Sequence, residues 1–137
     1  MKFLNQSFEE FFCKLFKDIA EKYKLKIEKV NDCTMHLRND IFTLTFSYDM
    51  DTSWIYYTIN DLHKSYLVSN YINVNAEEID KEGLYVDDTI SKNIERTMII
   101  QSRVLKRKFK DLLLGNMNWF DKYKETQFCY ETKLYQY

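Results

Sequence analysis

The segment 41–60 constrains the fold of this chain more than any other stretch, because two alternating runs meet there across a polar turn. In both runs apolar and polar residues alternate with a period of two, which is typical of a strand with one buried face. A four-residue loop would pair Tyr48 with Ser53 and align apolar residues on one face. The resulting apolar pairs are Phe42–Ile59, Leu44–Tyr57 and Phe46–Ile55. The sequence therefore predicts an antiparallel hairpin with one face that needs cover.

Two further alternating runs, 24–30 and 33–38, extend this hairpin to a four-stranded antiparallel meander. A tight turn at Asn39-Asp40 joins the second run to the hairpin, and a three-residue connection at 30–32 joins the two runs. The apolar pairs that these connections predict are Leu37–Phe42, Met35–Leu44, Cys33–Phe46, Ile27–Met35 and Leu25–Leu37.

A helix is expected to cover the apolar face of the meander. Ser7 and Glu10 form a capping-box pattern, and apolar residues follow at helical spacing up to Tyr23. This stripe could instead face a membrane or a partner. Burial on the adjacent sheet is the usual solution, and we expect it here.

The rest of the chain is predicted to contain both helices and short strands. Segment 66–74 favours a strand, although 61–64 could open a helical turn. A long helix spans 89–114 and stops at Gly115, and Asn118 caps a further helix. Segment 126–137 fits a helix or an edge strand. The prediction is a single α+β domain over 1–137: an N-terminal helix on a four- or five-stranded antiparallel meander, then a long helix and a C-terminal helical segment.

Trp54 and Tyr56 lie on the predicted outer face of this sheet, where large aromatic residues are typical of a recognition surface. Polar and basic residues share that face: His36, Arg38, Thr43, Thr45 and Thr58. The alternative is that the C-terminal segments cover it. If the face is free, it could also dimerise.

Two segments carry strong local charge. The first is acidic and contains Glu77, Glu78, Asp80, Glu82, Asp87 and Asp88, with Lys81 as its one cation. These residues could bind a basic partner, or solvate a loop and favour the start of the next helix. The second is basic and contains Arg103, Lys106, Arg107, Lys108 and Lys110. It could bind phosphate, or complement the dipole of its own helix.

Composition argues against several function classes. A net charge of −1 is unlike that of a dedicated nucleic-acid binder. With two glycines in the chain there is no glycine-rich phosphate loop. The three cysteines have no zinc-site or disulfide-framework spacing. The two histidines, His36 and His63, lie in no catalytic motif, so we expect no enzyme activity, cofactor or metal. A histidine in a concave pocket with a carboxylate would favour the opposite reading.

The N-terminus lacks the pattern of a signal peptide, and no apolar run approaches membrane-spanning length. We therefore expect a cytoplasmic protein that makes no contact with a membrane.

Three stretches resemble small bacterial immunity proteins of contact-dependent inhibition and polymorphic-toxin systems: SFEEFFCKLFKDIAEKY, IFTLTFSYDMDTSWIYYTI and FKDLLLGNMNWFDKYKE. They cover about half the chain, and none marks a family binding residue. The resemblance implies a cytoplasmic inhibitor that occludes the active site or substrate groove of one cognate toxin, for example a nuclease domain. The acidic segment, with Trp54 and Tyr56, would then contact the toxin. The alternatives are a nucleic-acid-associated accessory or phage-type protein that uses the basic end of helix 89–114, and a small enzyme.

Overall fold

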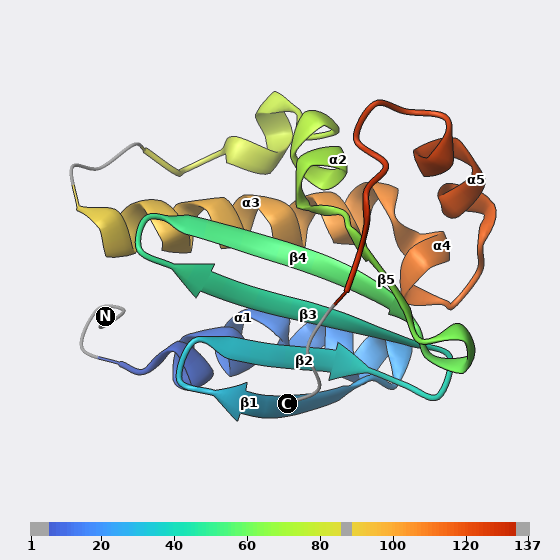
Figure 1. The fold of residues 1–137 in the computed structure, drawn as a ribbon. Helices are drawn as coiled ribbons and strands as arrows, with labels where there is room; N and C mark the ends of the chain where they lie inside the picture. The colour runs from blue at the N-terminus through green and yellow to red at the C-terminus, as the bar shows by residue number, and fades with distance from the viewer. Residues whose placement is uncertain (1–5, 86–88, 134–137) are drawn as a thin grey trace.

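The computed structural model describes residues 6–85 and 89–133. Within these residues the chain is an α+β fold with one six-stranded antiparallel sheet, whose strands lie side by side in sequence order (Figure 1). The elements are α1 (Phe8–Tyr23), β1 (Lys26–Asn31), β2 (Thr34–Arg38), β3 (Phe42–Asp49), β4 (Thr52–Ile59), η1 (Asn60–Leu62), β5 (Lys64–Leu67), α2 (Ser69–Val74), η2 (Glu78–Lys81), α3 (Ile90–Lys108), α4 (Lys110–Leu113), α5 (Asn118–Lys124) and β6 (Glu131–Thr132). The sheet thus has two strands beyond the four-stranded core of the prediction.

Helix α1 begins where the capping pattern predicts it and covers the sheet. The Ser7 Oγ accepts the backbone N–H of Glu10 at 3.1 Å. One face of the helix is buried, and its rings meet β3: the Phe46 ring centroid lies 5.0 Å from that of Phe12 and 4.8 Å from that of Phe16. The apolar stripe of α1 is therefore part of the core of the protein.

The β3–β4 hairpin has the predicted register. Tyr48 is opposite Ser53, and the three predicted apolar pairs are observed. The tip residue Met50 has a left-handed backbone with φ of 56°, which closes the loop. The alternating pattern was sufficient to predict this register because the loop has the length that the prediction assumed.

The registers of β1 with β2 and of β2 with β3 were predicted two residues away from the observed ones. Leu37 is opposite Leu44 and Ile27, and Cys33 lies in the β1–β2 turn, outside β2. The β2–β3 connection is longer than two residues because the Asn39 Oδ1 accepts the N–H of both Ile41 (2.8 Å) and Phe42 (3.0 Å). A shift of two keeps each side chain on its predicted face. Strand β1 also contains an irregularity between Lys29 and Asn31.

The expected strand over 66–74 is only partly correct. Lys64–Leu67 forms the fifth strand, but Ser69–Val74 is the helix α2. Val68 and Ile72 are both buried, one helical turn apart, and the Ile72 N–H donates to the Val68 carbonyl at 2.9 Å. Residues four positions apart share one face of a helix, so the burial of both side chains favours a helix here.

The long helix ends earlier than the sequence predicts. Helix α3 stops at Lys108, and a short α4 follows before Gly115. Gly115 has φ of 80°, a left-handed backbone that favours glycine. A Cβ there would lie 2.9 Å from the Cδ1 of Ile41, which is an exposed side chain that can move aside. The expected cap at Asn118 is wrong, since Asn118 is the first residue of α5 and Met117 precedes it as the N-cap.

The C-terminal helices cover the inner face of the sheet, as α1 does. The Trp119 ring of α5 lies 4.8 Å from that of Tyr57, and the Phe120 ring lies 4.9 Å from that of Tyr66. Figure 1 shows α1 and α3 behind the same face. After α5 the chain pairs with β5 as the two-residue edge strand β6, and 134–137 lie outside the described residues. The C-terminal helices thus do not cover the outer face, but the segment that follows α5 crosses in front of this face on its way to β6 (Figure 1).

Candidate protein-binding surface

Trp54 and Tyr56 stand on the outer face, as predicted. The register places Tyr56 opposite Thr45, which is itself opposite His36. Trp54 is opposite Ser47, one cross-strand row nearer the β3–β4 turn. Both aromatic side chains are half-buried, and their backbones are held by strand pairing. A rigid strand presents such side chains with little loss of conformational entropy on binding.

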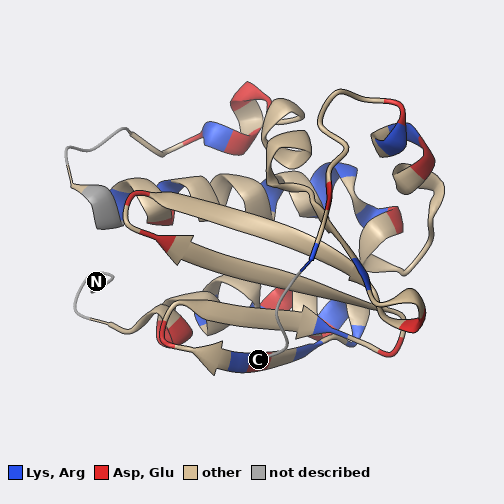
Figure 2. Cartoon of the chain, viewed as in Figure 1, with Lys and Arg blue, Asp and Glu red and all other residues tan. Residues whose placement is uncertain are grey.

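One end of the sheet is acidic and carries an exposed apolar residue. The β1–β2 and β3–β4 turns share this end, which is red in Figure 2, and they contain Asp32, Asp49 and Asp51. Met50, between the last two, is 78% exposed. Asp32 pairs with Lys29 at 3.3 Å, whereas Asp49 and Asp51 have no ion-pair partner among the residues described. We call Asp49, Met50, Asp51 and Trp54 the acidic tip.

Asp80, the centre of the predicted acidic segment, is buried at 2% exposure. The Arg107 guanidinium binds this carboxylate through two hydrogen bonds: Nε donates to Oδ1 at 3.0 Å and Nη2 donates to Oδ2 at 2.6 Å. The Glu77 N–H also donates to Oδ2, at 2.9 Å, and completes a capping box at the start of η2. These hydrogen bonds, those from Arg107 foremost, lower the pKa of Asp80. Its carboxylate is therefore used inside the fold.

The other acidic residues have different surroundings. Glu77 is exposed and pairs with Arg107 at 2.8 Å. Glu78 and Glu82 are exposed on or beside η2. Asp87 and Asp88 lie outside the described residues. The acidic segment is thus anchored to α3 through Asp80 and Glu77 and presents Glu78 and Glu82 to solvent.

The basic end of α3 supplies that anchor. Arg103 Nη1 donates to the carbonyl oxygens of Asp80 (3.2 Å) and Glu82 (2.7 Å). Lys106 reaches across to α1 and pairs with Asp18 at 2.8 Å. Lys108 and Lys110 are the exposed members of the cluster without an ion pair in the described part of the chain. The two charged segments, which the sequence presents as separate surfaces, are therefore in contact: Arg107 forms ion pairs with Asp80 and Glu77, and Arg103 binds the backbone of the acidic segment.

Both histidines line one hollow of about 450 Å³ on the outer face, at the end opposite the acidic tip. The hollow also contains Asp40 and Arg38, together with Asn39, Thr43, Thr58 and Asn60. His36 is half-buried, and burial is the main cause of its lowered pKa. This arrangement of a histidine and a carboxylate is the one that would favour an enzyme.

The described part of the chain contains no group of three or more His, Cys, Asp or Glu side chains placed to hold a metal ion. Cys13, Cys33 and Cys129 are free thiols. No described helix has the length and apolar character needed to cross a membrane.

No protein-family model, curated protein or solved structure matches this chain.

The acidic tip was only partly visible in the sequence. Asp49, Met50 and Asp51 read as a polar turn, with no indication that Met50 would be so exposed. The alternating pattern does place Trp54 two residues beyond that turn, which is the signal that could have joined the two features.

Proposed function

We propose that this chain is a cytoplasmic inhibitor of the immunity-protein kind, which binds one protein toxin and blocks its active site or substrate groove. The observation that carries the proposal is the acidic tip: an exposed methionine between two carboxylates, on a rigid hairpin beside a tryptophan. We infer that the tip enters the toxin groove and that Tyr56 extends the contact along the outer face.

The chemistry of the tip suits a basic groove, such as that of a nuclease. Methionine and tryptophan are enriched in the cores of protein interfaces, and tryptophan is a frequent hot spot. Asp49 and Asp51 have no ion pair in the described structure to break before they meet a cationic partner. Carboxylates in such positions accelerate encounter with a basic surface. Glu78 and Glu82 could contribute in the same way.

The first prediction concerns Asp49 and Asp51. We expect D49K/D51K to slow association with the toxin by at least about tenfold at low salt, because attraction becomes repulsion. The matched control is D61K, which reverses an exposed acid at the opposite end of the sheet. The measurement is surface plasmon resonance against the product of the reading frame immediately upstream of this gene. Equal association rates for the parent, D49K/D51K and D61K would remove the acidic tip from the interface.

The same experiment with W54A distinguishes a direct contact in the complex, which controls dissociation, from electrostatic attraction, which controls association. Loss of a hot-spot tryptophan is expected to raise the dissociation rate by about 30-fold or more and leave the association rate nearly unchanged. Circular dichroism checks that the hairpin is intact. Protection of cells by W54A at the parent level would contradict the proposed contact.

A nucleic-acid-associated role is less well supported, because Arg103, Lys106 and Arg107 already have partners within the fold. Retention on DNA or RNA that falls steeply with salt would favour that role over the inhibitor.

The hollow containing His36, His63 and Asp40 favours a second candidate, a small enzyme using histidine as a general base. The lowered pKa of His36 keeps its imidazole neutral to a pH below the ordinary value of 6.5. Hydrolysis of p-nitrophenyl acetate should then be faster than in buffer and fall by about a hundredfold in H36Q. An equal rate in the parent and H36Q would reject this candidate.

A further inference from the structure

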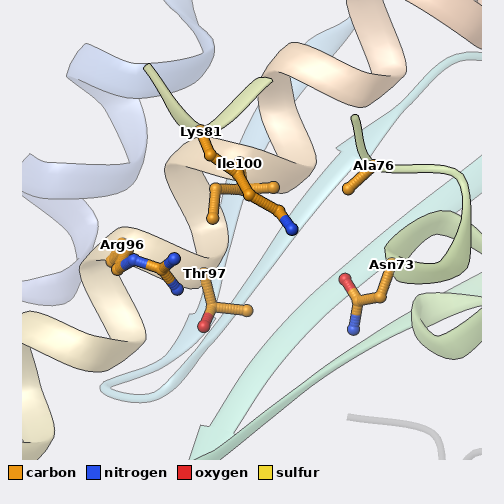
Figure 3. Close-up of a pocket in the computed structure, with 6 residues that line it drawn as sticks. All are labelled: Asn73, Ala76, Lys81, Arg96, Thr97 and Ile100. Carbon is orange, nitrogen blue, oxygen red and sulfur yellow. The ribbon is translucent and has the colours of Figure 1, made fainter. Parts of the chain in front are cut away.

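A second depression, separate from the acidic tip and from the histidine hollow, lies among α2, η2 and α3. It has a volume of about 190 Å³ and is lined by Asn73, Ala76, Lys81, Arg96, Thr97 and Ile100 (Figure 3). In that view the Lys81 ammonium reaches the middle of the ring formed by these residues, and the Arg96 guanidinium is directed toward Thr97. Three elements thus line the pocket, and two of them, η2 and α3, each bring one cation to it.

Lys81 and Arg96 form no ion pair with any described residue, whereas Arg107 of α3 pairs with both Glu77 and Asp80. The Arg96 Nε is buried and has no hydrogen-bond acceptor. A buried donor without an acceptor costs about 1–3 kcal/mol, so native structures seldom retain one without a reason. An anion in the pocket would supply the missing acceptor.

The remaining polar groups are also able to donate. Thr97 contributes a hydroxyl group. The Asn73 Oδ1 already accepts from the Gln101 Nε2 at 3.1 Å, while the Asn73 amide NH2 has no acceptor among the described residues. Ala76 and Ile100 form an apolar part of the wall. The pocket therefore combines donors, two positive charges and a short apolar surface.

We propose that this pocket binds the phosphate group of a small phosphorylated molecule. A phosphate monoester near neutral pH carries a charge of about −1.5 to −2, which two cations balance, and its three terminal oxygens accept from several donors at once. The volume equals about six times the 30 Å³ share of one liquid water, enough for a phosphate and a few carbon atoms. The apolar wall receives the carbon part. This assignment does not depend on toxin binding.

The test is calorimetric titration of the full chain with glycerol phosphate, inorganic phosphate and acetate. We expect a submillimolar Kd for glycerol phosphate and at least about tenfold weaker binding in R96Q and in K81M, because each removes one charge from the pocket. K108M is the matched control, since Lys108 is an exposed cation of α3 that does not line the pocket. It should bind within about twofold of the parent.

The ligands and variants distinguish the outcomes. Tighter binding of glycerol phosphate than of inorganic phosphate supports a phosphorylated metabolite, and equal affinity supports free phosphate in the same site. Acetate binding as tightly as either phosphate would overturn the assignment to phosphate. So would a Kd for both phosphates above about 10 mM, or binding that R96Q and K81M leave unchanged.

Discussion

Phe46→Ala is expected to lower the free energy of unfolding by about 3–5 kcal/mol, the largest effect of any single change proposed for this protein. Phe46 is 1% exposed, and its ring contacts those of Phe12 and Phe16 on α1. Truncation removes the aromatic contacts and leaves a cavity between helix and sheet, which the paired backbone of β3 cannot close. At this chain length the expected fall in Tm is roughly 10–17 °C.

Denaturant unfolding followed by circular dichroism measures this effect. F128A is the matched control, because Phe128 undergoes the same chemical truncation but is only half-buried and precedes the edge strand β6. It should cost less than about half as much. If F128A were as damaging as F46A, the contact of α1 with β3 would not be the centre of the core.

Asp80→Asn is expected to destabilise the fold by about 2–3 kcal/mol, equivalent to a fall in Tm of roughly 7–10 °C. The amide keeps the shape of the side chain but removes the charge held by Arg107 and replaces one acceptor with a donor. This loss of stability is smaller than that expected for a fully buried ion pair, because the Arg107 side chain remains 30% exposed. E78Q, an exposed neighbour in η2, is the control and should change stability by less than about 0.5 kcal/mol.

The effect of D80N should depend on pH. Arg107 lowers the pKa of Asp80 below its ordinary value of 3.8, so the carboxylate stabilises the folded state fully only above that value. As the pH falls toward the lowered pKa, Asp80 becomes protonated in the unfolded and then in the folded state, and this stabilisation is lost. The gap in stability between the parent and D80N is expected to be constant at pH 6–8 and to narrow below about pH 4. A gap that widens in acid would contradict the ion pair.

Local pattern predicted the sheet better than its connections. The period of two in β3 and β4 fixed the face of each residue and, with a loop of the assumed length, the partner of each residue. The β2–β3 register required knowing that the Asn39 side chain would bond to two backbone N–H groups and lengthen the turn. The face assignment of β2 survived that error because the shift was even, so His36 and Arg38 still lie on the predicted outer face.

The pairing of the charged segments was beyond sequence reasoning. Asp80 and Arg107 are 27 residues apart and meet only because η2 packs against α3. The same packing brings Lys81 to Arg96 in the pocket of Figure 3. The charge density of a sequence segment does not show which charged side chains are buried or which of them form ion pairs. An acidic run and a basic run therefore look like two separate surfaces until the structure shows that they are in contact.

The two edges of the sheet limit how this protein can associate. Strand β1 carries Lys26, Glu28 and Lys29 and loses its regular pairing geometry at Asn31, while β6 at the other edge is only two residues long. Charged, irregular or very short edge strands resist pairing with a strand from another molecule. Continuous growth of the sheet from copy to copy, the first step toward fibrils, is therefore disfavoured. A partner must instead recognise side chains on a face or a turn.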